Sequence, residues 1–165
     1  MKKLIQGGRL LDISGQAAPP SDILIDGDVI VEIGQPGMAA PDAEIVDASD
    51  RLVIPGLVNA HGHGHGNLGK ATGDRWTLEL MLNAAPWSTG RRSVEERRLS
   101  ATLAAVELVR KGCTATVDLQ VEFPSPSRDG LEQIGAAYEE VGLRAVIAPM
   151  FADRTLYEAI PGLNN

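Results

Sequence analysis

The chain has 165 residues, of which 44% are hydrophobic, 22% charged and 4% aromatic, and it carries a formal net charge of −7. This length allows one domain with a sizeable core, or a small domain joined to part of another, and the apolar content argues against disorder. The acidic balance argues against a nucleic-acid partner, which needs clustered Lys and Arg. No stretch reaches the ~18 apolar residues that a membrane span requires.

The N-terminus and the cysteine content bear on the compartment. Residues 1–8 carry positive charge but contain no apolar segment of signal-peptide length. Cys113 is the single cysteine and cannot form an internal disulfide, which fits a reducing environment. We therefore expect a soluble, cytoplasmic protein.

Residues 1–55 read as short strands with turns between them. Two runs, 3–6 and 9–13, flank a pair of glycines, and two further runs, 22–25 and 29–33, bracket an Asp-Gly-Asp turn. An Asp-Gly pair between apolar runs is a hairpin signal, because glycine accepts the positive φ of a tight turn. We predict a small β-sandwich-like domain over residues 1–55, as part of a composite domain, and a second domain over residues 56–165.

All three histidines of the chain follow the apolar run 52–58, alternating with glycine as His61, His63 and His65. In a strand, side chains at i and i+2 point to the same side, so His61 and His63 can present two imidazole nitrogens to one point. The glycines between them suit a place where the backbone passes close to another group. This arrangement is half of a metal site.

Two simpler explanations compete with this one. A lone histidine here would more often be a core or loop residue that bonds to the backbone, and a loose Gly-His tract could bind adventitious metal. A flexible tract would not need the apolar strand that precedes the histidines. We therefore favour the organised metal site.

The segment 67–90 predicts a helical turn at residues 77–83 inside a loop that lies over the strand end. Ser93 and Glu96 then form a capping box, which starts an amphipathic helix that Gly112 ends. The spacing predicts that its buried face is apolar. The residues expected on that face are Leu99, Leu103, Val106 and Val109.

Two further strands are predicted at residues 113–119 and 143–150, with a helix over 131–141 between them. Strand and helix alternating at this spacing indicate parallel β/α units, whose active groups lie at the carboxyl ends of the strands. We therefore expect the two histidines, Asp118 and the segment 150–154 around one mouth. Asp153 and Arg154 there would touch substrate or form a surface ion pair.

The run 54–63, Ile-Pro-Gly-Leu-Val-Asn-Ala-His-Gly-His, resembles strand 1 of the metal-dependent amidohydrolase superfamily, in the branch of cytosine deaminases and chlorohydrolase-like enzymes. The stretches 112–118 and 142–146 are similar as well. The resemblance implies an α/β fold: a small N-terminal β domain followed by the first three β/α units of a TIM-type (β/α)₈ barrel, apparently truncated. It also implies that His61 and His63 bind one divalent metal, zinc or alternatively iron.

The activity implied by the resemblance is hydrolytic deamination, or related C–N hydrolysis, of a cyclic nitrogen-containing small molecule by metal-activated water. This chain departs from the family in its glycine-rich mouth. His65 and Asp118 are our candidates for substrate binding, against a solvent-facing loop histidine and a hydrogen-bond acceptor at the barrel mouth.

The resemblance also places further ligands and a proton shuttle on later strands: a His and a Glu on strand 5, a His on strand 6 and an Asp on strand 8. They have no counterparts here, and such barrels need about 250 residues, so no catalytic residue is assigned in this chain. We expect the parent protein to be an enzyme and the segment alone to be inactive. An open sheet edge predicts dependence on the missing C-terminal chain or on a homo-oligomer.

Two alternatives stay open. One is a non-catalytic metal-binding or assembly module. The other is a fragment of a dihydroorotase- or hydantoinase-like cyclic amidase with two metals and a bridging lysine on strand 4. Lys70 and Lys111 do not sit at a strand end, so nothing in this chain supports that bridge.

Overall fold

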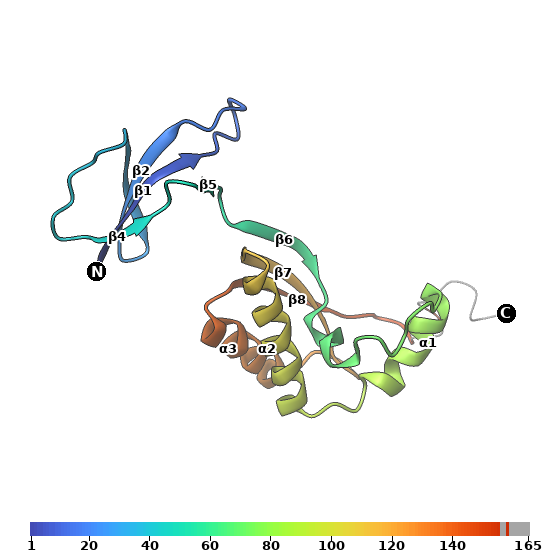
Figure 1. The fold of residues 1–165 in the computed structure, drawn as a ribbon. Helices are drawn as coiled ribbons and strands as arrows, with labels where there is room; N and C mark the ends of the chain where they lie inside the picture. The colour runs from blue at the N-terminus through green and yellow to red at the C-terminus, as the bar shows by residue number, and fades with distance from the viewer. Residues whose placement is uncertain (156–157, 159–165) are drawn as a thin grey trace. The chain divides into compact units, whose positions relative to one another are not determined.

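The computed structural model describes residues 1–155 and 158, and the chain divides into two compact units, Met1–Pro55 and Gly56–Asn165 (Figure 1). The first unit is built from strands alone, and the second alternates strands with helices. Among the described residues, no helix is long and apolar enough to cross a membrane.

The first unit is one five-stranded sheet in the order β3-β2-β1-β4, with β5 also paired to β1. The β1–β2 and β2–β3 pairs are antiparallel, and β4 and β5 run parallel to β1. The predicted hairpin is confirmed, because Asp26 pairs with Val29 across a two-residue turn in which Gly27 has a φ of 62°. The strands are β1 (Lys2–Leu10), β2 (Pro20–Asp26), β3 (Val29–Gly34), β4 (Glu44–Asp47) and β5 (Leu52–Val53).

The sequence divides the first strand in two, but the structure makes it one. Strand β1 runs through the glycine pair with a register irregularity between Ile5 and Gly8, and Gly7 has a φ of 73°. A glycine bulge lets the strand bend and continue where we expected a turn. Within residues 1–55 the structure describes a single sheet, so a sandwich-like arrangement of two sheets stays a prediction about a composite domain.

A buried carboxylate holds this bulge. Asp22 is 0% exposed, and its two oxygens accept hydrogen bonds from the backbone N–H groups of Gly7 at 2.7 Å, Gly37 at 2.8 Å and Met38 at 2.9 Å. The bond from Gly7 contributes most to lowering the pKa of Asp22 below its usual value, against the opposing effect of burial. Asp22 therefore ties β1 to the loop after β3.

The second unit contains a three-stranded parallel sheet in the order β6-β7-β8. Two helices, α2 and α3, lie side by side against it (Figure 1). The mixed α/β arrangement that the sequence predicts is therefore confirmed, whereas the eight-unit barrel stays a prediction. The elements are β6 (Leu57–Gly62), the 3₁₀ segment η1 (Gly64–Gly69), α1 (Leu78–Ser88), α2 (Val94–Arg110), β7 (Cys113–Val121), α3 (Arg128–Val141) and β8 (Arg144–Met150).

Helix α2 begins and ends as predicted but buries another face. The Ser93–Glu96 capping box is present, and Gly112 follows the helix with a φ of 84°. The predicted apolar face is instead solvent-accessible, with Leu99 56% exposed, and alanines contact α3 in its place. Small side chains let two helices approach closely. The buried core consists of Ala101, Ala105, Ile134, Ala137, Tyr138 and Leu143.

Helix α1 is longer than the single turn expected at residues 77–83. It spans Leu78–Ser88 and includes Pro86 near its end, and the Thr77 side chain caps it by accepting the Leu80 N–H. No residue of α1 is buried. The Thr77 cap and residues of high helix propensity favour the longer helix, although Pro86 cannot donate a hydrogen bond to the preceding turn.

Candidate metal centre

Strand β6 ends in a bulge that places the histidines. Asn59 pairs with Thr116 and Gly62 pairs with Asp118, so three steps along β6 match two along β7. The Asn59 side-chain amide also donates to the Thr116 hydroxyl at 3.1 Å, which holds the register before the bulge. A bulge turns the following side chains relative to the regular alternation. His61 lies inside this bulge, at the carboxyl end of the strand.

The two imidazoles meet at their Nε2 atoms. These nitrogens of His61 and His63 are 3.0 Å apart, with the ring planes inclined at 75°. Two nitrogens that each lie about 2.0–2.1 Å from one zinc ion at a tetrahedral angle are about 3.3 Å apart. The spacing therefore fits a shared cation, and it also fits a hydrogen bond in which one ring donates to the other.

The carbonyl of Leu119 orients the second and third rings. His63 Nδ1 lies 3.3 Å from this oxygen and His65 Nδ1 lies 3.1 Å from it. A carbonyl only accepts, so each Nδ1 donates to it, and the neutral form of each ring then has its lone pair on Nε2. A longer contact of 3.4 Å from the Val121 amide competes for the His65 nitrogen. His63 can therefore offer Nε2 to a cation.

Burial lowers the pKa of His65 below its usual value, and the neighbouring His63 lowers it further. Asp118 opposes this effect through its charge. His65 is therefore mainly neutral at neutral pH, with Nε2 as an acceptor. The rings of His63 and His65 lie edge to face with centroids 5.5 Å apart.

Asp118 is buried beside the histidine segment and lines the same small cavity as His63. It is 1% exposed, and its Oδ1 accepts the Gly64 N–H at 2.7 Å. Its Oδ2 accepts from the Tyr138 hydroxyl and from the Gln120 side-chain amide. Burial, followed by the bond to Asp118, raises the pKa of Tyr138 far above its usual value, so this phenol stays a donor. The Asp118 carboxylate holds the backbone after His63, and its contact with substrate stays a prediction.

Ser100 of α2 holds the same segment from the other side. It is 0% exposed, and its hydroxyl donates to the Gly64 carbonyl at 2.8 Å, with the His65 carbonyl 3.1 Å away as the alternative acceptor. The same oxygen accepts the Leu68 N–H at 3.3 Å. The Arg92 guanidinium also donates to the His65 carbonyl.

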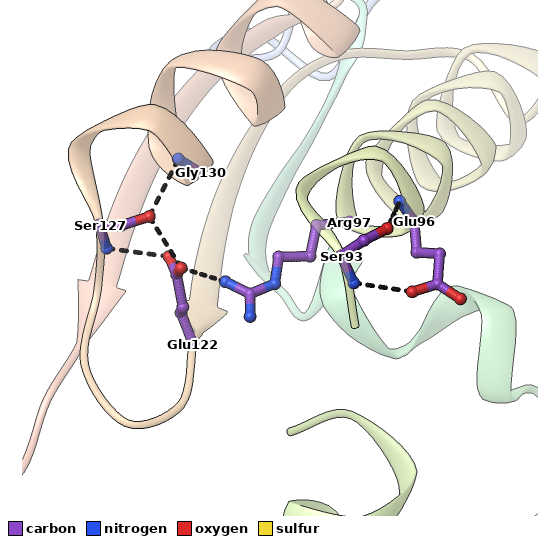
Figure 2. A network of polar contacts seen from close by, with 6 residues as sticks. All are labelled: Ser93, Glu96, Arg97, Glu122, Ser127 and Gly130. Carbon is purple, nitrogen blue, oxygen red and sulfur yellow. Dashed lines mark hydrogen bonds and ion pairs between the residues drawn. The ribbon is translucent and has the colours of Figure 1, made fainter. Parts of the chain in front are cut away.

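A second polar network ties the loop after β7 to both helices (Figure 2). Arg97 of α2 is 9% exposed and pairs with Glu122, which also accepts from the Ser127 N–H at 2.9 Å and from its hydroxyl at 2.7 Å. Burial alone would raise the pKa of Glu122, but the Ser127 bonds and the Arg97 charge together lower it. Ser127 in turn caps α3 by accepting the Gly130 N–H at 3.1 Å.

The described residues do not form a complete metal site. Among residues 1–155 and 158, no group of three or more His, Cys, Asp or Glu side chains could hold a metal ion. The cavity beside His63 has a volume of about 110 Å³, whereas ligand pockets usually have ~300–1,000 Å³. A larger hollow of about 450 Å³ lies between α3 and β8, and no histidine lines it. Asp153 and Arg154 are exposed and do not pair with each other.

Sequence reasoning missed the residues that hold the histidine segment. These residues are Tyr138, which donates to Asp118, and Ser100, which donates to the Gly64 carbonyl. A small polar residue among alanines in the middle of a helix is a signal that could have found Ser100, because such a hydroxyl needs a partner when it is buried.

The structure thus places a histidine pair at the end of the first strand of a parallel β/α sheet. The chain is 36% identical over 149 residues to a 5-methylthioadenosine/S-adenosylhomocysteine deaminase of Haloarcula marismortui, which covers 87% of this chain and 32% of that protein. It is also 34% identical over 129 residues to a 5′-deoxyadenosine deaminase of Methanocaldococcus jannaschii, and this match covers 77% of this chain and 29% of that protein. No family model matches the chain.

Solved structures share the fold of most of this chain. An atrazine chlorohydrolase from Arthrobacter aurescens, complexed with zinc, matches with a TM-score of 0.76 and 24% identity over 88% of this chain and 35% of that one. An amidohydrolase from a Sargasso Sea sample matches with a TM-score of 0.69 and 26% identity, over 94% of this chain and 35% of that one. The chain spans about a third of the length of the relatives it matches. Its resemblance to the amidohydrolase superfamily is thereby confirmed.

Proposed function

We propose that this chain is part of a metal-dependent hydrolase of the amidohydrolase superfamily, in which His61 and His63 bind one divalent cation. The 3.0 Å separation of their Nε2 atoms carries the proposal. Imidazole suits zinc and also iron, and zinc is our first choice because the similar atrazine chlorohydrolase was solved with it. The other ligands would come from parts of the protein outside the described residues.

The proposed reaction is hydrolytic deamination of a cyclic nitrogen-containing small molecule. A divalent cation at this site supplies a water of lowered pKa as the nucleophile. The relatives support this class, since they are named as deaminases of adenosine derivatives. This chain's own part is to bring the two imidazoles together, with the Leu119 carbonyl accepting from Nδ1 of His63.

We propose His65 as a contact for substrate. Its Nδ1 is bound to Leu119, which leaves Nε2 to accept a hydrogen bond from an amino group or a ring N–H. Asp118 is retained as a candidate contact, but its three hydrogen bonds give it a clear structural task first. No residue of this chain is assigned the proton transfer.

The remaining surface of the sheet supports a larger assembly. Val58 of β6 is 67% exposed and Val146 of β8 is 62% exposed. Apolar side chains on a parallel sheet are normally covered on both faces. We propose that the chain works with further barrel strands, supplied by the whole protein or by a second copy.

The experiment measures zinc and turnover in the whole protein to which this chain belongs, and the unsubstituted whole protein is the parent. Zinc content after dialysis is compared for the parent, His61→Ala, His63→Ala and, as the matched control, His65→Ala. We expect both ligand variants to lose zinc and the control to retain it. Equal zinc in all four proteins would overturn the metal assignment.

Turnover is then measured with an adenosine derivative. Ammonia release from the parent but not from His63→Ala supports a deaminase. Ring opening of a cyclic amide without ammonia release would instead favour a cyclic amidase. Zinc binding without turnover of either compound would favour the non-catalytic module.

A further inference from the structure

Two successive peptide groups after His63 are held by buried side chains from two different elements. The N–H of Gly64 belongs to the peptide that joins it to His63, and it donates to Asp118 of β7. The carbonyl of Gly64 belongs to the next peptide, and it accepts from Ser100 of α2. Gly64 itself is buried. We call this arrangement of Asp118, Gly64 and Ser100 the Gly64 clamp.

The clamp matters because the His63 ring has little other support. The His63 side chain is exposed, and its one bond to another part of the chain is the 3.3 Å contact of Nδ1 with Leu119. Its backbone has a φ of −133° and a ψ of 69°, so it belongs neither to the strand before it nor to the 3₁₀ segment after it. The direction of the imidazole therefore depends on how the next peptide is held.

The packing around Gly64 leaves no freedom for adjustment. A Cβ at this position would lie 2.6 Å from Asp118 Oδ2 and 2.6 Å from the Tyr138 hydroxyl. Asp118 bonds only to neutral donors, which are Gly64, Gln120 and Tyr138. Losing either clamp residue would leave a buried peptide group of Gly64 without its partner, and such a group costs free energy unless the backbone moves.

We propose that Ser100 and Asp118 are positioning residues for His63: acting on the two sides of Gly64, they hold the His63 imidazole with Nε2 facing His61. Ligand groups need to be held within about 0.5 Å of their working geometry to bind a metal well. The expected effect on metal affinity rests on the proposed function. The expected effect on the orientation of the His63 ring does not.

The first measurement is the zinc affinity of the whole protein to which this chain belongs, by competition with a chelator. We expect Ser100→Ala to weaken zinc binding by about tenfold and Asp118→Asn by up to about 100-fold, the range seen when partners that orient metal ligands are lost. Thr102→Ala is the matched control, since it removes a hydroxyl from the same helix that bonds only to Arg98 of that helix. We expect this control to keep the parent affinity.

The second measurement needs no metal. Nitrogen NMR of the imidazoles in the metal-free chain should show His63 protonated on Nδ1 in the parent and in Thr102→Ala. In Ser100→Ala we expect a mixture of both tautomers. This readout follows the ring and would not move with a general loss of stability, and Ser100→Ala covers the case in which Asp118→Asn fails to fold.

The outcomes separate the two proposals. If the parent binds no zinc but the His63 tautomer changes in Ser100→Ala, the metal centre fails and the clamp stands. An unchanged tautomer together with parent zinc affinity in Ser100→Ala would overturn the clamp. An equal loss of zinc affinity in Thr102→Ala would also overturn it.

Discussion

Two buried aspartates, one in each unit, show why burial alone does not mark a functional residue. Asp22 and Asp118 are both almost fully buried, and each accepts three hydrogen bonds. The donors to Asp22 are all backbone amides of a bulge and a loop, and only these bonds and burial shift its pKa. Asp118 holds the peptide next to His63. Both carboxylates fix a backbone segment by accepting hydrogen bonds. Only Asp118 does so next to imidazoles, which are groups that can bind a cation.

Removal of the Asp118 side chain should have the largest effect. In Asp118→Ala, the Gly64 N–H, the Gln120 amide and the Tyr138 hydroxyl lose their acceptor in a buried place. We expect a loss of about 3 kcal/mol in the free energy of unfolding of the second unit, together with weakened zinc binding. Urea denaturation and chelator competition measure the two effects. Parent stability in this variant would contradict the network.

Gly64→Ala should come next. The added Cβ would lie 2.6 Å from the Tyr138 hydroxyl, and neither the phenol nor the carboxylate beside it can move without losing a bond. We expect a loss of about 1–3 kcal/mol and weaker zinc binding. Gly66→Ala is the control from the same segment, because a Cβ there meets nothing within 4 Å. Similar losses in both variants would show that the segment, and not the clamp, is sensitive.

Asp22→Asn tests the buried carboxylate of the first unit. We expect it to lower the unfolding midpoint of the first unit and to leave zinc affinity unchanged. Because hydrogen bonding lowers the pKa of Asp22 in the folded state, its contribution is present above the unfolded value of 3.8 and is lost as the pH falls below it through the folded value. The parent should therefore lose stability more steeply than the variant as the pH falls below 3.8. Equal slopes would contradict this assignment.

The smallest effect is expected on the exposed apolar face of α2, which consists of Leu99, Leu103, Val106 and Val109. Leu99 is 56% exposed, so Leu99→Ser should change the free energy of unfolding by no more than about 0.5 kcal/mol. Ala105→Leu, on the buried face, should cost about 1–3 kcal/mol by overpacking. Urea denaturation of both variants tests this contrast. A large loss in Leu99→Ser would mean that another chain or segment covers the exposed apolar face.

The sequence alone determined the features that depend on near neighbours. The Asp26 hairpin, the Ser93 capping box and the glycine after α2 follow from residues within a few positions of one another. The spacing of His61 and His63 predicted that the two rings could meet, but the bulge against β7 and the distant partners of Gly64 set how they do so. Their role as metal ligands stays a proposal.

Tertiary structure decided which surfaces are buried and what holds the site. Spacing could not show that α2 would bury alanines in place of leucines, because the choice depends on how closely α3 approaches. Nor could it show the Gly64 clamp, whose partners lie 36 and 54 residues away along the chain. A hydrogen bond between distant residues forms only when the fold brings its donor and acceptor together, so no local pattern in the sequence records it.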